Sequence, residues 1–393
     1  MFPSAAEPYL PAATATALED LAFRLAREAG ALAGQLPAPV TLQVGELLRS
    51  MNCYYSNLIE GHDTHPRDID RALAADYSHD ATRRNLQLEA RAHIEVQRLV
   101  DGGQVAPQPA ASRGFITWAH REFCSRLPDT LLAVTNPDTG ERLPVVPGEM
   151  RSRAVAVGRH VPPPAADLPA FLERFEQAYA AGHLSRSRQV VAVAAAHHRL
   201  LWIHPFLDGN GRVARLMSHA MFLELGMGSA LWSVSRGLAR NVARYKELLM
   251  AADAPRRGDH DGRGALSEAA LTDFCRFFLE CCLDQVGFMR ELLQPAELQR
   301  RVARYTRDEV DAGRLPAGAV EILREVLLVG EVARGRVAGL VGTSDRSARR
   351  VTARLIERKL LMAGSHRAPL RLGIPLEVVE HWFPRLYPEA ASS

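Results

Sequence analysis

Lysine is almost missing from this sequence: only Lys246 and Lys359 occur among 48 basic residues. We interpret this shortage, together with the abundance of alanine, as a sign of GC-rich coding and therefore of a bacterial source. Arginine supplies nearly all of the positive charge, and the formal net charge is only +3. The number of arginines is therefore by itself a weak indication of an anionic partner.

Cysteine patterns and long apolar runs are lacking as well. The five cysteines show neither metal-ligand spacing nor a disulfide framework, so we expect small buried apolar residues. His62, His65, His79 and His93 have no paired ligand spacing either, and we expect no metal site among them. No apolar run approaches the roughly 20 residues that span a bilayer, and the N-terminus has no basic-then-apolar signal. We therefore expect no membrane partner and, by default, a cytoplasmic location.

What the sequence does contain is ordinary globular material. Its 393 residues are 47% hydrophobic and 24% charged, which is enough for two or three domains. The apolar periodicity favours a mainly α-helical protein. We divide the chain into an N-terminal helical region (1–105), a central core (106–300) and a smaller C-terminal domain (310–393).

The stretch 203–215 concentrates side chains that carry chemistry. Gly209 and Gly211 flank Asn210, and such a run can adopt left-handed backbone angles that turn successive N–H groups toward one point. Apolar residues at spacings of three and four follow Gly211 and predict a helix. The turn therefore lies at a helix N-terminus, where unpaired N–H groups and the helix dipole favour phosphate.

The charged residues of this stretch fit a bound nucleotide. Asp208 is a candidate ligand for a divalent cation between phosphate oxygens. Arg212 and Arg215 share a helix face and can reach a polyphosphate, while the imidazole of His204 is suited to accepting a proton near neutral pH. Each part alone has a structural alternative, namely a hydrogen-bonded histidine, a plain turn or a solvated helix face. Their order, taken together, favours the chemical interpretation.

From His204 to Arg215 the sequence runs His-Pro-Phe-x-Asp-Gly-Asn-Gly-Arg-x-x-Arg, which resembles the signature of the Fic (Fic/Doc) domain at every position. The resemblance implies a Fic-type helical core that transfers AMP from ATP, with Mg²⁺, to a hydroxyl of a target protein. The roles it implies are His204 as general base, Asp208 as magnesium ligand, Gly209, Asn210 and Gly211 as phosphate cradle, and Arg212 and Arg215 as holders of the outer phosphates.

A second helix is predicted over about residues 44–61, where an apolar stripe ends at Gly61. Glu60 in the last turn opposes the helix dipole and needs a cation from elsewhere; a solvated glutamate is the alternative. Ser56-x-x-x-Glu60-Gly61 resembles the family's inhibitory motif, in which the glutamate pairs with the second arginine of the signature, here Arg215. The resemblance therefore implies a self-restrained enzyme, and it leaves open whether the chain also removes AMP.

Three further features lie on either side of the signature. A helix that begins at Ser112 carries His120, which we expect to be structural. The periodicity breaks over 144–164, where the resemblance implies a short β-hairpin flap that aligns a target segment by backbone hydrogen bonds; a plain surface loop is the alternative. The resemblance also makes Tyr245 a candidate for the adenine pocket, although an aromatic residue on an amphipathic helix is otherwise a core residue.

The C-terminal part has a different pattern. Helices are predicted over 316–328, 332–340 and 345–361, followed by a hairpin over 361–373. This order resembles a winged helix-turn-helix, whose third helix enters the DNA major groove. Because winged helices also serve as docking and dimerisation modules, a DNA partner, a protein partner and a homodimer all stay open.

These features favour a protein adenylyltransferase (AMPylase), a nucleotidyltransferase that modifies a Ser, Thr or Tyr hydroxyl of another protein or of itself. Glu60 would restrain it. The alternative is a DNA-binding transcriptional regulator whose Fic core senses nucleotide. The intact signature favours the enzyme, because a sensor needs no base such as His204.

Overall fold

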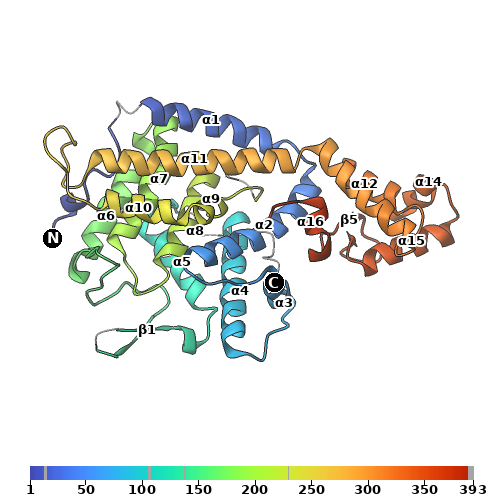
Figure 1. Ribbon diagram of the computed structural model, residues 1–393, viewed down its shortest axis with the longest axis horizontal. Helices are drawn as coiled ribbons and strands as arrows, with labels where there is room; N and C mark the ends of the chain where they lie inside the picture. Colours follow the sequence, from blue (N-terminus) through green and yellow to red (C-terminus); the bar gives the residue numbers. More distant parts are fainter. Residues whose placement is uncertain (13–15, 105–107, 137–138, 229, 388–393) are drawn as a thin grey trace. The chain divides into compact units, whose positions relative to one another are not determined.

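The computed structural model describes residues 1–12, 16–104, 108–136, 139–228 and 230–387 (Figure 1). The prediction of a mainly α-helical protein is confirmed. The chain divides into two compact units, one of Met1–Gly30 and Asn52–Val286 and the other of Ala31–Met51 and Gly287–Ser393. The three segments predicted from the sequence stay a prediction, and their first boundary, at 105/106, lies outside the described residues.

The first unit holds the predicted signature. Its helices, three of which continue into the second unit's residues, are α1 (Thr16–Ala33), α2 (Ala38–Ile59), α3 (Pro66–Leu73), α4 (Ala81–Asp101), α5 (Arg113–Cys124), α6 (Leu168–Tyr179), α7 (Arg186–Ile203), α8 (Asn210–Glu224), α9 (Ser235–Arg240), α10 (Val242–Ala252) and α11 (Glu268–Leu292) (Figure 1). In the described part of the chain, no helix is both long and apolar enough to cross a membrane. All five cysteines are free and buried, as predicted.

Helix α7 is buried along most of its length because nearly all of its residues from Val190 onward are apolar. Even Arg199 is 0% exposed, since its guanidinium donates hydrogen bonds to the backbone carbonyls of Pro8 and Ala252. α7 packs against α6 and α8, and α8 packs against α5. The loop between α7 and α8 therefore starts and ends on well-packed helices, which fix the positions of its two ends.

The β-hairpin of this unit lies earlier in the chain than predicted. β1 (Ala133–Thr135) pairs antiparallel with β2 (Arg142–Pro144). The described stretch 144–164 holds no strand beyond the end of β2, only an isolated bridge between Val157 and His160. The prediction of a hairpin over that stretch is therefore wrong.

The reason lies in the backbone partners of this stretch. The N–H of Gly148 donates to the Nδ1 of His120, and the N–H of Arg151 donates to the carbonyl of Pro205. The prolines at 162–164 have no N–H to contribute to a ladder. The segment thus binds to the helices around it instead of pairing with itself.

The second unit ends in a compact group of helices and short strands. In order these are α12 (Pro295–Asp311), α13 (Ala319–Val329), β3 (Glu331–Val332), α14 (Val337–Val341), α15 (Asp345–Glu357), β4 (Leu361–Met362), β5 (Leu370–Leu372) and α16 (Val379–Trp382). The three strands form one antiparallel sheet in the order β3-β5-β4. The predicted hairpin over 361–373 is confirmed. The predicted helix over 332–340 is wrong at its start, because Val332 is buried in β3 opposite Leu370.

Candidate active site

The loop between α7 and α8 is a tight turn with two residues in left-handed conformation. His204 follows the end of α7 with φ 49° and ψ 62°, and Gly209 precedes α8 with φ 78°. The helix begins at Asn210, so the first N–H groups of α8 lack intrahelical partners, as the sequence predicted for an anion site. Only Gly209 of the two glycines uses the positive φ; Gly211 is already helical.

Side chains on both sides brace this loop. The Asn210 amide accepts from the Phe206 N–H at 3.0 Å and donates to the Phe206 carbonyl at 2.9 Å. The ring of His120 stacks on Phe206 with centroids 3.9 Å apart and an angle of 2°. His120 is 0% exposed, which fits the structural role expected for it. The Asn210 side chain thus closes the loop, and only its backbone N–H is left for an anion.

His204 presents a neutral imidazole beside the loop. Its ring donates a hydrogen bond to the carbonyl of Leu201, which leaves the other ring nitrogen as an acceptor. Burial, together with the charges of Arg151 and His160, lowers the pKa of His204 to about 4, against the opposing effect of the Leu201 bond and of Asp208. At neutral pH the imidazole is therefore unprotonated and able to accept a proton.

Arg215 is bound by residues from the end of α2. It is buried, and its Nε donates to the Ser56 hydroxyl at 2.8 Å while its Nη2 donates to Glu60 Oε1 at 2.5 Å. Burial raises the pKa of Glu60, but the charge and hydrogen bond of Arg215 outweigh this, so the pKa is lowered overall. Gly61 has φ 86° and turns the chain directly after the glutamate.

The carboxylate of Glu60 also lies against the first turn of α8. A Cβ on Gly211 would come within 2.3 Å of Glu60 Oε1, so only a glycine allows this approach. A helix N-terminus favours negative charge at such a place. The position that the sequence predicted for a phosphate is thus held by an anion of the protein itself.

Arg212 has an acidic partner that the sequence analysis missed. Its Nη2 donates to Glu89 Oε2 at 2.7 Å, and the Nδ1 of His62 lies 2.9 Å from the same oxygen. Burial raises the pKa of Glu89, but the hydrogen bond of His62 and the charge of Arg212 outweigh it and lower the pKa overall. The available signal was an acid on α4 three residues before the buried Ala92. Both signature arginines are therefore paired with carboxylates from the first 90 residues.

Two predicted site residues lie apart from these pairs. Tyr245 is 2% exposed, and its hydroxyl lies 2.7 Å from the Nε2 of His197 in the core of the first unit. No described contact joins it to the loop, so its place fits the core alternative better than an adenine pocket. Asp208 is exposed.

The fold and the loop define a mainly helical protein in which an unprotonated histidine and an anion-binding helix N-terminus are six residues apart in the chain. A family model described as the Fic/DOC family matches residues 115–222, which contain both. These residues form a Fic domain.

The relatives share this domain and little more. The protein adenylyltransferases Fic of Drosophila erecta and Drosophila ananassae are 41% and 42% identical to this chain over 83 residues, which is 21% of this chain and 17% of each relative. A Fic family protein from Desulfovibrio desulfuricans G20 has a similar fold, with a TM-score of 0.50 and 17% identity over 90% of this chain and 96% of that one. A fragment of Fic-1 from C. elegans also gives a TM-score of 0.50, with 15% identity over 72% and 74% of the two chains.

Proposed function

We propose that this chain is a protein adenylyltransferase that holds itself in a restrained state. The observation that carries the proposal is the pairing of a neutral His204 with an α8 N-terminus that already binds an anion. The matched Fic domain, and the name of the relatives that share it, support the same activity. The target would be a Ser, Thr or Tyr hydroxyl of another protein or of the chain itself.

The reaction can be written with these groups. The target hydroxyl oxygen bonds to the α-phosphorus of ATP, the bond to the bridging oxygen of the β-phosphate breaks, and pyrophosphate leaves. His204 takes the hydroxyl proton. The backbone N–H groups at the start of α8 stabilise charge on the phosphoryl oxygens, and the guanidiniums of Arg212 and Arg215 bind the outer phosphates once they are free.

Asp208 fits the magnesium ion that the family implies. Its carboxylate is exposed, and none of the described basic side chains pairs with it. Within the described residues there is no cluster of three or more candidate metal ligands. One carboxylate combined with phosphate oxygens and water suits Mg²⁺, which would offset charge on the phosphates when bound.

The restraint would come from Glu60. While Arg215 pairs with this carboxylate it cannot grip the outer phosphates, and a negative charge lies where a phosphate would bind. ATP would then bind in a geometry that is poor for in-line attack. The same glutamate leaves room for a role in AMP removal, for which the described contacts offer no separate support.

The test is a mass measurement on the Glu60→Gly protein after incubation with ATP and Mg²⁺. We expect an AMP adduct on the chain itself or on an added lysate protein, and no adduct in the Glu60→Gly/His204→Ala double variant. An adduct that persists without His204 would show that another group is the base. No adduct on any protein in the single variant would contradict the transferase activity.

A second candidate function rests on the C-terminal group of the second unit. The order α13-β3-α14-α15-β4-β5 and the sheet order β3-β5-β4 support the winged-helix interpretation. Three exposed arginines of α15, Arg346, Arg349 and Arg350, have no carboxylate partner among the described residues. They favour a phosphate backbone as ligand, and with it the alternative of a DNA-binding regulator.

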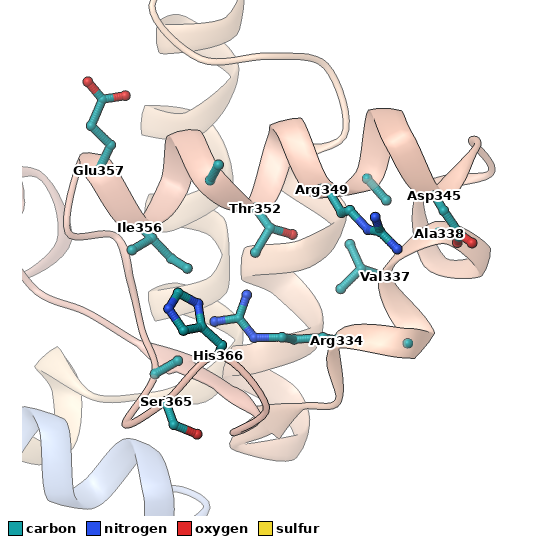
Figure 2. A pocket seen from close by; sticks show the side chains of 14 residues that line it. Arg334, Val337, Ala338, Asp345, Arg349, Thr352, Ile356, Glu357, Ser365 and His366 are labelled. Carbon is teal, nitrogen blue, oxygen red and sulfur yellow. The ribbon is translucent and has the colours of Figure 1, made fainter.

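A groove beside α15 adds to this candidate. It has a volume of about 860 Å³ and is lined by α15, the start of α14 and the loop between β4 and β5. Figure 2 shows Arg334, Arg349 and His366 around it. If duplex DNA binds here, its affinity should fall steeply with salt, and replacing Arg346, Arg349 and Arg350 by alanine should flatten that slope by about three.

The control for this test loses the same charge elsewhere. Arg244, Arg276 and Arg300 are exposed arginines that pair with Glu247, Asp273 and Glu297. Their triple alanine variant should leave the salt dependence unchanged. No retention of duplex DNA at low salt would instead favour protein docking or dimerisation.

A further inference from the structure

A buried arginine outside the signature grips the end of α7. Arg151 is 3% exposed. Its Nε donates to the His204 carbonyl at 2.8 Å, and its backbone N–H donates to the Pro205 carbonyl at 2.9 Å. Its Nη2 reaches the Pro163 carbonyl at 2.6 Å and the Ile203 carbonyl at 3.5 Å.

The partners of this guanidinium are unusual. All of its hydrogen bonds go to backbone carbonyls, including that of Arg153 at 2.9 Å, and no carboxylate pairs with it in the described chain. A buried cation is costly unless its donors are satisfied. The last carbonyls of a helix lack intrahelical partners and carry partial negative charge, so a cation there is favoured.

The neighbouring carbonyl is held from the same segment. The Nε2 of His160 lies 2.7 Å from the Trp202 carbonyl. Three successive carbonyls, from Trp202 to His204, are thus bound by side chains of the segment 151–160. The constraint falls at the one residue of the loop that adopts a left-handed conformation without being glycine, His204 with φ 49°, a conformation that needs support from its surroundings.

We propose that Arg151 is a positioning residue for His204: by binding the carbonyls at the end of α7, it fixes the backbone of the base and so aims the imidazole at the target hydroxyl. The inference rests on the proposed function for its catalytic consequence. Arg151 touches neither the imidazole nor the α8 N-terminus in any described hydrogen bond, so its effect is on the base and not on the nucleotide.

The charge of Arg151 acts on the same imidazole. The groups that face His204 are Arg151, His160, Asp208 and the Leu201 carbonyl. Of these, Arg151 and His160 lower the pKa of His204, and Asp208 and Leu201 raise it. Loss of the guanidinium charge should therefore move the pKa of His204 from about 4 toward its ordinary value of 6.5.

The experiment compares Arg151→Gln, Arg151→Lys and Arg153→Gln, each in the Glu60→Gly background. Arg153 is the matched control, because it lies two residues away, is exposed and pairs with Glu141. For Arg151→Gln we expect kcat to fall about a hundredfold, the size of effect that a misplaced reacting group produces, with KM for ATP nearly unchanged. Arg151→Lys keeps the charge and should recover part of kcat, while Arg153→Gln should match the parent.

A second measurement does not depend on activity. The ring resonances of His204 are titrated by NMR in the otherwise unchanged chain and in its Arg151→Gln variant. We expect a higher pKa for His204 in the variant, and no change in Arg153→Gln. Thermal unfolding and ATP binding of each variant show whether the fold is intact.

The outcomes separate the two ideas. A Glu60→Gly parent that transfers no AMP contradicts the proposed function, and the NMR titration then still decides whether Arg151 acts on His204. An unmoved pKa of His204 in a folded Arg151→Gln protein, or a kcat equal to that of the Arg153→Gln control, would overturn the inference. So would a loss of ATP binding as large as the loss of kcat.

Discussion

The two ends of the loop between α7 and α8 are held in opposite ways. At the α7 end, Arg151 and His160 bind backbone carbonyls around His204. At the α8 end, the carboxylates of Glu60 and Glu89 bind the guanidiniums of the signature. We call these the base half and the phosphate half of the site.

The difference lies in what the reaction must disturb. The contacts of the base half involve main-chain carbonyls that ATP has no need to touch, so this half can stay assembled throughout a cycle. Those of the phosphate half use the same donors that would bind polyphosphate, and they must be exchanged before catalysis. The molecule therefore combines a preformed base with a covered nucleotide site.

The largest expected effect separates the two halves. In the Glu60→Gly background, His204→Ala should lower AMP transfer by about 10²- to 10⁴-fold, the usual contribution of a general base, and leave ATP affinity intact. Arg215→Ala in the same background should weaken ATP binding by about tenfold or more, since a hydrogen bond to a charged group contributes on the order of 1.5–3 kcal/mol. Calorimetric titration with ATP and Mg²⁺ measures the affinities.

These two variants also test the division itself. Because Glu60 is absent from both, Arg215→Ala leaves no unpaired carboxylate behind, and misfolding is not expected. If His204→Ala weakened ATP binding as much as Arg215→Ala does, the two halves would not be separate.

The next effect concerns Glu89. The side chains of Arg212 and Glu89 are 6% and 12% exposed, and removing one partner of a buried pair costs on the order of 3 kcal/mol. Glu89→Gln should therefore lower the melting temperature of the nucleotide-free protein, and ATP should raise it more than in the unchanged chain, because Arg212 is free to bind phosphate. Thermal unfolding with and without ATP measures both changes.

Glu95→Gln provides the control for that experiment. Glu95 lies on the same helix, pairs with Arg91 and Arg126 and is more exposed, so its loss should change neither quantity much. An equal ATP-induced rise in the unchanged chain and in both variants would mean that Glu89 does not compete with the nucleotide.

The pH dependence of transfer sharpens the account of the base half. The pKa of His204 is lowered to about 4, so the competent, neutral imidazole is present above that value and is lost as the pH falls through it. Initial rates of the Glu60→Gly protein should vary little between about pH 6 and 8 and decline only below about pH 5. An acid limb near the ordinary histidine value of 6.5 would place the base in a more solvated site.

The smallest effect concerns His62. Its hydrogen bond to Glu89 raises its pKa, so the stability it contributes is fully present below its unfolded value of 6.5 and is lost as the pH rises through its folded value. Because His62 is 39% exposed, we expect less than about 1 kcal/mol. The melting temperature of His62→Gln should match the unchanged chain at alkaline pH and lie slightly below it at pH 6, whereas His79→Gln should show no such trend.

Much of the loop could be predicted from the sequence, because its features are local. Two glycines around an asparagine, followed by an apolar period of 3.6, predict a turn and a helix start without any knowledge of the fold. The stop at Gly61 follows the same logic. The pairing of Glu60 with Arg215 joins residues 155 positions apart and was expected only through the resemblance.

The rest depends on contacts that spacing does not encode. Glu89 and Arg151 are ordinary charged residues in the sequence, and only burial beside Arg212 or at the end of α7 distinguishes them. The hairpin was expected over 144–164 because proline and glycine mark turns, yet the backbone N–H groups of Gly148 and Arg151 bind other segments. For Tyr245 the amphipathic helix already offered the core alternative that its contact with His197 favours.

The most direct test of the central claim is the rate of AMP transfer by the unchanged chain and by Glu60→Gly at saturating ATP and Mg²⁺. If the base half is assembled and only the phosphate half is covered, removal of this one carboxylate should raise the rate on the order of tenfold or more. Equal rates in the two proteins would contradict the account, because the Glu60–Arg215 pair would then impose no restraint.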